Sequence, residues 1–272
     1  MGIPQETRHY AFGDSGAARR AFGARTLEAD LAFLLPSLKP GMTLLDCGCG
    51  GGGLAAQLAR HLAPGEVVGF DQNTNAIEQA RALADADAIP NLRFEVASVY
   101  DAPLPPASFD VVLFCGVLGH IADPERALRH ACSLLKPGGL LAARELAKQG
   151  DWFGGSHSDT LEAVNRIHIN EIQAAGGDPF IGSRLGSLLQ SLGFLEIAAT
   201  PGFSPALSSV EVLGALFMRR LQEDEFIQRV ASRGRHSAAE LRAMVPAVES
   251  WMQDGTSVVG MSECNVLARK PR

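Results

Sequence analysis

The stretch LLDCGCGGGGLAAQLARHL, residues 44–62, decides how this chain folds. Its apolar start ends in an acid and leads into a turn in which Gly48, Gly50 and Gly52 alternate. Leucines then recur every fourth residue, a spacing that places side chains on one face of a helix. The turn needs glycine because its backbone takes positive φ and must approach a ligand closely. The stretch therefore predicts a strand, a glycine loop and a helix whose free amides complete a nucleotide-type binding site.

Two acids indicate which kind of ligand this loop binds. Asp46 precedes the glycines, where a carboxylate would repel a diphosphate, so a cation is the better ligand. Asp71 follows the next apolar run, Val67–Phe70, at about the distance where the ribose-binding acid of such folds lies. An alternative role for Asp71 is to stabilise a helix that begins at Asn73. An NAD-dependent oxidoreductase uses similar glycine spacing, but the position of Asp46 disfavours that reading.

Further motifs follow in order along the chain. Phe109–Cys115 is typical of a buried fourth strand, and Leu134–Leu141 of a helix end, a turn and a fifth strand. Leu-Asp-x-Gly-x-Gly, Asp71, Ser108–Val112 and Leu135–Gly139 together resemble the class I S-adenosylmethionine-dependent methyltransferases. The resemblance implies an α/β fold with a Rossmann-like, mostly parallel sheet of seven strands, a reversed last strand and helices on both faces.

The resemblance is strong over residues 40–145 and weaker beyond them. Tyr10–Gly13, Arg144-Glu145, Gly176–Arg184 and Val266–Pro271 are similar to bacterial and fungal small-molecule methyltransferases, including the ubiquinone/menaquinone C-methyltransferase group. The family implies S-adenosylmethionine as cofactor and S-adenosylhomocysteine as product. The positions expected to contact the cofactor are Tyr10, Asp46, Gly48, Cys49, Gly50, Asp71, Gln72, Ser98, Val99, Cys115 and Gly116.

Some of these contacts depend on motif position alone. Ser98 stands where many relatives have an aspartate that accepts from the adenine amino group, and a serine does so only weakly. Val99 is expected to pack on the adenine ring, while Cys115 and Gly116 offer carbonyl groups to the amino acid end of the cofactor. Tyr10 either closes over the cofactor or packs at the surface.

Three histidines are candidates for acid–base chemistry. Methyl transfer depends mainly on positioning, but a phenolic acceptor needs a base. His120 follows the fourth strand, where relatives often carry a histidine beside the acceptor, and its pKa is expected near 6.5 if unperturbed. His120 could instead cap or pack under a lid. His157, in a glycine-rich loop, and His168, on an apolar helix face typical of core residues, are the further candidates.

Composition narrows the class of protein. The 272 residues are 46% hydrophobic and 20% charged, with a net charge of −6, which suits an enzyme with a substantial core. Because no basic run appears, a nucleic-acid substrate is not expected. Neither a signal peptide nor a membrane span is indicated, so a cytoplasmic location is expected. Five cysteines lack the spacing of a zinc site, and Cys47-x-Cys49 is interpreted as reduced thiols in the glycine motif, with no metal.

The chain is expected to divide into four parts. Residues 1–38 form an N-terminal helical segment over the cofactor site, and residues 39–204 form the core with a helical insertion at about 151–182. Residues 205–255 are too long for a simple connection and are predicted to form a helical lid. Residues 256–272 supply the final strand. The lid helices could also form a homo-oligomer interface.

Local patterns set the expected element boundaries. Helical spacing predicts a helix over 17–35 that Pro36 ends, and the final strand is predicted over Val258–Leu267. Two capping-box patterns in the lid are Ser208-x-x-Glu211 and Ser237-x-x-Glu240.

These patterns favour a methyltransferase of secondary metabolism that uses S-adenosylmethionine and a small aromatic or polyketide-like acceptor. Methylation at oxygen is the first expectation, and methylation at carbon or nitrogen the second. The alternative is an enzyme of the same fold that binds the cofactor while it catalyses a non-methylating cyclisation or rearrangement.

Overall fold

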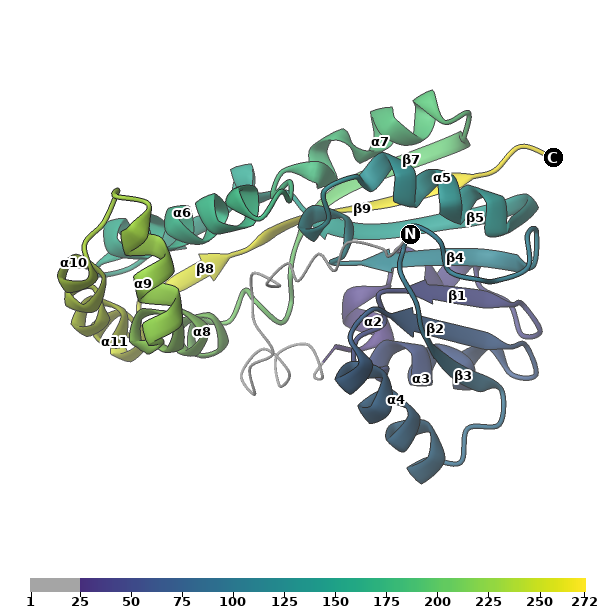
Figure 1. The fold of residues 1–272 in the computed structure, drawn as a ribbon, viewed down its shortest axis with the longest axis horizontal. Helices are drawn as coiled ribbons and strands as arrows, with labels where there is room; N and C mark the ends of the chain where they lie inside the picture. Colours follow the sequence, from purple (N-terminus) through teal and green to yellow (C-terminus); the bar gives the residue numbers. More distant parts are fainter. Residues whose placement is uncertain (1–24) are drawn as a thin grey trace, which may run out of the picture.

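A seven-stranded sheet runs through the computed structural model, which describes residues 25–272 (Figure 1). Its strand order is β3-β2-β1-β4-β5-β9-β7. Strands β1 to β5 are parallel, and β9 runs antiparallel to both β5 and β7. The predicted fold class, with its reversed last strand, is confirmed. The strands are β1 (Leu44–Cys47), β2 (Val67–Asp71), β3 (Leu92–Val96), β4 (Phe109–Cys115), β5 (Leu135–Leu146), β7 (Leu195–Phe203) and β9 (Ser262–Arg269).

Helices cover both faces of this sheet, which explains why its central strands are apolar without alternation. In β1, Leu44 packs in the cluster that includes α3 and α4, while the adjacent Leu45 packs in the cluster that includes α5 and α7. The covering elements are α2 (Leu27–Asp30), α3 (Gly53–Leu62), α4 (Thr74–Ala86), α5 (Pro124–Leu134), α7 (Ile181–Ser191) and the 3-10 turns η1 (Leu35–Ser37), η2 (Leu118–His120) and η3 (Lys148–Gly150).

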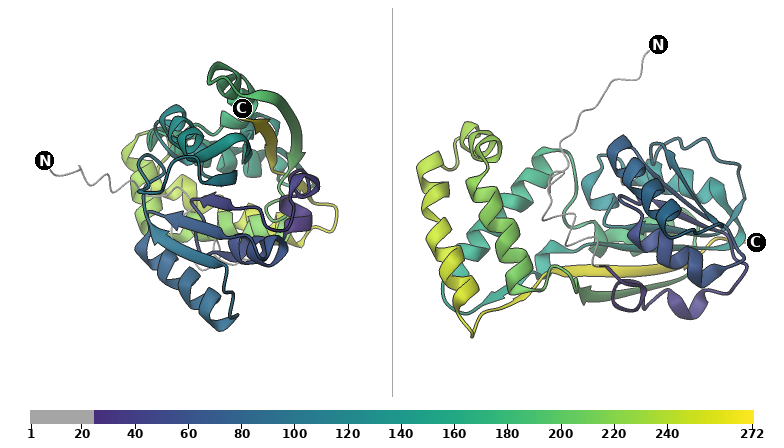
Figure 2. Two further views of the ribbon diagram at one scale, coloured as in Figure 1. Left: turned by 90° about the vertical axis from the view of Figure 1, so that its right-hand side faces the viewer. Right: turned by 90° about the horizontal axis from the view of Figure 1, so that it is seen from below.

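A helical lobe lies beside one end of the sheet (Figure 2). It has its own hydrophobic cluster, in which Trp251 is fully buried and its indole Nε1 donates to the Gly154 carbonyl at 2.9 Å. A two-stranded ribbon, β6 and β8, joins this lobe to β5 and β9. The ribbon consists of β6 (Trp152–Gly154) and β8 (Val258–Gly260), and the lobe comprises α6 (Ser158–Ala174), α8 (Val210–Gln222), α9 (Asp224–Ser232), α10 (Ala238–Ala243) and α11 (Val245–Gln253).

Two predicted boundaries near the ends of the chain are wrong. Within the described residues the helix expected over 17–35 is short, because Thr26 caps a new helix that ends at Asp30. Asp30 then pairs with the buried Arg144 of β5, which ties this turn to the sheet. The predicted strand over 258–267 is divided at Met261, whose side chain packs in the lobe while its amide donates to Ser208 Oγ at 3.0 Å.

The capping predictions have mixed outcomes. Ser237 and Glu240 form the predicted capping box at the start of α10. The prediction of Ser208 as a cap is wrong, because Ser209 caps α8 by accepting from the Val212 amide. Ser208 is one residue too early, and its hydroxyl serves the Met261 amide instead.

Candidate cofactor and acceptor site

The glycine loop after β1 has the geometry of a ligand cradle. Gly48, Gly50 and Gly52 take φ values of +76°, +54° and +79°, which only glycine adopts without strain. The amides of Gly48 and Cys49 donate to the Phe70 carbonyl at 2.8 and 2.9 Å, which fixes the loop to β2. A Cβ built at Gly50 would meet no heavy atom within 4 Å. The loop is therefore rigid at its base and open at its tip.

Asp71 links the end of β2 to this loop. Its Oδ2 accepts from the Gly50 amide at 3.1 Å, and its Oδ1 accepts from the Asn73 amide at 2.9 Å. Asn73, in turn, caps α4 by accepting from the Ala76 amide. The position of Asp71 is compatible with both predicted roles. Its carboxylate supports the start of α4, and it also lies beside the glycine loop, where a ribose would bind.

Asp46 is a buried carboxylate at the end of β1. Desolvation raises its pKa to about 7, the nearby Arg25 charge opposes this rise, and Asp71 adds to it. A buried acid of this kind gains most from a cationic ligand, since a cation restores the charged form. The carboxylates at this edge of the sheet therefore fit a ligand with ribose hydroxyls and a cationic group.

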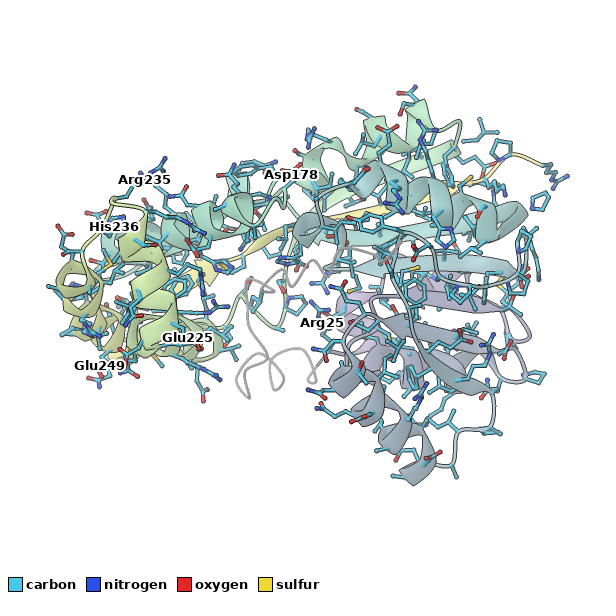
Figure 3. All side chains as sticks on the ribbon, in the orientation of Figure 1. Arg25, Asp178, Glu225, Arg235, His236 and Glu249 are labelled. Atoms are coloured by element: carbon cyan, nitrogen blue, oxygen red, sulfur yellow. The ribbon has the colours of Figure 1, made fainter. Side chains whose placement is uncertain are left out.

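Arg25 is a site residue that sequence reasoning misses. Its guanidinium Nη1 donates to the Cys115 carbonyl at 3.4 Å and approaches Cys115 Sγ at 3.5 Å. Figure 3 shows Arg25 at the edge of the sheet that faces the helical lobe. The Cys115 carbonyl, expected to serve the cofactor, thus already has an arginine beside it.

The other residues predicted to contact the cofactor lie at the same edge of the sheet, and they differ in burial and in hydrogen bonding. Ser98 Oγ accepts from the Tyr100 amide at 3.2 Å, and Val99 packs against the core cluster beside it. Gly116 has φ +72°, and its amide donates to the Arg144 carbonyl at 2.8 Å. Gln72 is exposed after β2. The prediction for Tyr10 lies outside the described residues.

His120 lies close enough to His168 to lower the pKa of that residue, whereas His157 has no such effect on either histidine. Lys148 lowers the pKa of both histidines through its positive charge, and His120 also lowers the pKa of His168, which is buried on α6. His157 is exposed at the start of α6. The structure therefore brings together two of the three histidine candidates and adds a lysine from η3.

The imidazole of His120 is strongly perturbed, so the pKa near 6.5 expected for an unperturbed ring does not apply. Desolvation, together with the smaller effects of the positive charges of Lys148 and Arg25, lowers the pKa of His120 to about 3. Burial, followed by the charges of Lys148 and Arg220, also lowers the pKa of His168 well below its usual value. Both imidazoles are therefore neutral at physiological pH. The sequence shows none of these charges beside His120, because they come from separate elements.

Lys148 belongs to a buried polar network between the sheet and the lobe. Its Nζ lies 3.1 Å from Asp151 Oδ2, which also accepts from Asn165 Nδ2 at 2.9 Å. Asp151 Oδ1 accepts from the Ser262 amide at 2.7 Å. Within residues 25–272, Asn165 Oδ1 has no hydrogen-bond donor although it is buried. This network contains a buried acceptor atom that a ligand hydroxyl could satisfy.

A glycine loop and two acids, one near the end of β1 and one at the end of β2, are typical of an α/β protein that binds a nucleoside-type cofactor at the carboxyl edge of its sheet. A methyltransferase domain model matches residues 38–179. The chain is also 30% identical to an uncharacterised methyltransferase of Schizosaccharomyces pombe over 99% of both chains. The chain therefore belongs to the methyltransferase domain family, which confirms the resemblance to S-adenosylmethionine-dependent methyltransferases.

Other relatives match smaller parts or show the fold. The chain is 36% identical to 27-O-demethylrifamycin SV methyltransferase of Amycolatopsis mediterranei, over 50% of each chain. A phosphoethanolamine N-methyltransferase of Haemonchus contortus, solved with S-adenosylhomocysteine, has a TM-score of 0.61 at 21% identity and covers 94% of this chain and 56% of its own. Membership of the methyltransferase domain family supports S-adenosylmethionine as the cofactor. The chain spans about half the length of several curated relatives.

Within residues 25–272, no helix is both long enough and apolar enough to cross a membrane.

Proposed function

We propose that the protein transfers a methyl group from S-adenosylmethionine to an oxygen atom of a small aromatic or polyketide-like acceptor. The observation that carries this proposal is the meeting of two features at one edge of the sheet. The glycine loop with Asp46 and Asp71 lies at the ends of β1 and β2, and His120 follows β4, which is hydrogen-bonded to β1. The name of the rifamycin relative supports an oxygen acceptor.

The residues around the glycine loop suit this cofactor. Asp71 would hold the ribose hydroxyls, and the open tip at Gly50 leaves room beside them. Arg25 is cationic and Asp46 ionises readily beside a cation, which suits the carboxylate and the ammonium of the cofactor's amino acid end. When bound, S-adenosylmethionine supplies a methyl group already activated as a sulfonium.

The chain's own residues would prepare the acceptor oxygen. A neutral His120 accepts a hydrogen bond from a hydroxyl group, but an imidazole whose pKa is about 3 is a weak base. Lys148 is paired with Asp151 at 3.1 Å, and its ammonium group, as a hydrogen-bond donor, would favour the ionised form of a nearby phenol or enol. Lys148 therefore promotes loss of the acceptor's proton, while His120 and His168 orient the oxygen.

The helical lobe is proposed to limit access to this site. Its α6 carries His168 and Asn165, so the lobe supplies polar groups as well as a wall. A small acceptor would enter between the lobe and the carboxyl edge of the sheet, where water exclusion favours methyl transfer. A homo-oligomer through the lobe helices stays a prediction.

A matched pair of acceptors tests the proposal. The protein is incubated with S-adenosylmethionine and a panel of phenols, each beside the aniline of the same skeleton, and products are identified by mass spectrometry and NMR. Methyl ethers are expected, without the corresponding N-methylanilines. Lys148→Met should reduce the rate most for the least acidic phenols, because these depend most on help with ionisation. Products methylated only at nitrogen or carbon would contradict the oxygen assignment.

A further inference from the structure

The turn that follows β4 is held by one buried carboxylate. Glu145, in β5, is fully buried and accepts hydrogen bonds from three consecutive backbone amides. Its Oε1 lies 2.9 Å from the amides of Val117 and Leu118, and its Oε2 lies 3.1 Å from the amide of Gly119. Within the part of the chain that the structure describes, Glu145 forms no ion pair with a lysine, arginine or histidine. Its hydrogen-bond partners are these three backbone amides, so its role is to fix a backbone conformation.

This turn connects the two halves of the candidate site. A Cβ built at Gly48 would lie 2.6 Å from Val117 Cγ2, so the Val117 side chain packs directly against the glycine loop at Gly48. At its other end the turn continues into η2, where the His120 amide donates to the Val117 carbonyl at 3.0 Å. A shift of residues 117–119 would therefore move a wall of the cofactor loop and the acceptor histidine together.

The segment 176–182 supports the opposite side of the turn. The Asp178 amide donates to the Gly119 carbonyl at 3.0 Å, and a Cβ at Gly177 would lie 2.5 Å from that same oxygen. A Cβ at Gly182 would lie 2.9 Å from the Glu145 carbonyl oxygen. On this side of the turn, backbone atoms therefore pack directly on backbone atoms. The Glu145 side chain is the contact to the turn that a substitution can change without altering this backbone packing.

We infer that Glu145 is a positioning residue, which fixes residues 117–119 and so places Val117 on the glycine loop and His120 beside the acceptor. The backbone part of this inference stands on the three hydrogen bonds. The statement about the acceptor rests on the proposed function. An ionised carboxylate suits this task because both oxygens accept, whereas a neutral carboxyl or an amide presents a donor to one of the three N–H groups.

The protonation state of Glu145 should therefore matter. Burial raises its pKa to about 7, the three amide hydrogen bonds oppose that rise, and Glu263 adds to it. The other charged groups nearby form ion pairs with residues other than Glu145. Arg144 pairs with Asp30 and Glu263, and Asp178 pairs with Arg184. As pH falls through about 7, Glu145 gains a proton and its hold on the turn weakens.

The test is hydrogen exchange at individual amides of the full-length protein, read by NMR. In Glu145→Gln, the hydrogen exchange of the amides of residues 117–119 should be about tenfold to a hundredfold faster. This factor corresponds to the free-energy cost of leaving one buried donor without a hydrogen bond. The matched control is Asp110→Asn, which alters a carboxylate that accepts from the Thr43 amide at 2.8 Å at the opposite edge of the sheet. This control should leave residues 117–119 unchanged.

A second measurement keeps the inference testable if Glu145→Gln does not fold. In the wild type, protection at residues 117–119, corrected for intrinsic exchange, should decrease between about pH 8 and pH 6, while amides in β1 keep theirs. Unchanged protection in Glu145→Gln, an equal loss in Asp110→Asn, or no local pH effect in the wild type would overturn the inference. Calorimetric titration with S-adenosylhomocysteine separates the two proposals: absent binding with intact exchange effects contradicts the proposed function alone.

Discussion

The Asp71 carboxylate accepts a hydrogen bond from the Gly50 amide at 3.1 Å, so the acid after β2 and the glycine loop after β1 form one unit. The same carboxylate accepts from the Asn73 amide at 2.9 Å. Because both bonds are made by the protein itself, the acid is already oriented before any ribose arrives. Asp71 therefore has a structural role through both carboxylate oxygens, and its contact with the ribose stays a prediction.

Replacing Asp71 by Ala should weaken the binding of S-adenosylhomocysteine by about 1.5 to 3 kcal/mol, the worth of hydrogen bonds to a charged group. Calorimetric titration measures this loss, and Asp110→Asn at the opposite edge of the sheet is the control. Asp71→Asn should lose less, because its amide oxygen can still accept one bond. Wild-type affinity in Asp71→Ala would show that this acid does not contact the cofactor.

Asp46 should couple cofactor binding to proton release. Its pKa is raised to about 7, so much of the free protein carries a proton there at neutral pH. The ammonium group of S-adenosylhomocysteine favours the ionised form, so affinity should rise as pH increases through about 7. Titrations in buffers with different ionisation enthalpies should detect the released proton, and Asp46→Asn should abolish it. Equal apparent enthalpies for the wild type in all buffers would contradict the coupling.

The same pKa shift makes the stability of the free protein depend on pH. Because the folded-state pKa of Asp46 is raised above 3.8, its contribution to stability is fully present below pH 3.8 and is lost as pH rises through about 7. The wild type should therefore lose stability relative to Asp46→Asn between about pH 4 and pH 7, and the difference should be constant above that range. Urea unfolding of both proteins at several pH values measures the difference, and parallel curves would argue against a buried ionisable Asp46.

His120→Ala should lower the methylation rate of an accepted phenol by about tenfold to a hundredfold. This loss is at or below the lower end of the effects that general-base catalysis typically gives, because the imidazole is a weak base. Since its pKa is lowered to about 3, the wild-type rate should show no His120 limb near pH 6.5. The control is His157→Ala, which alters an exposed residue. A limb near pH 6.5 that disappears in His120→Ala would show that the ring titrates normally.

The helical lobe should behave as a preformed body. Its helices pack on their own hydrophobic cluster, with Trp251 and Leu221 fully buried. Hydrogen exchange should therefore find α8 and α11 protected without ligand, with ligand-induced changes confined to the ribbon of β6 and β8. Unprotected lobe helices that become ordered only with cofactor and acceptor would contradict this account.

Local features of the sequence were sufficient to predict the sheet, the glycine loop and Asp71. Positive φ at Gly48 and Gly50, and the apolar run of each strand, depend on neighbours in the chain, so they can be read from a short stretch. The same holds for the capping box of Ser237 and Glu240, whose partners lie three residues apart.

Contacts between distant elements could not be predicted in this way. Arg25 meets Cys115 across 90 positions, and Lys148 acts on His120 and His168 from a third element. The pKa of His120 depends on those charges and on its packing, neither of which its neighbours in the sequence reveal. The misplaced cap at Ser208 has the same origin, because its hydroxyl serves the amide of Met261.

Transfer of an isotopically labelled methyl group tests the central claim most directly. The protein is incubated with S-adenosylmethionine that carries a trideuteriomethyl group and with acceptors found in the phenol panel, and products are analysed by mass spectrometry. The account predicts a methyl ether that contains the intact trideuteriomethyl group, formed together with an equal amount of S-adenosylhomocysteine. A rearranged or cyclised product without deuterium, formed while the S-adenosylmethionine is not consumed, would contradict it.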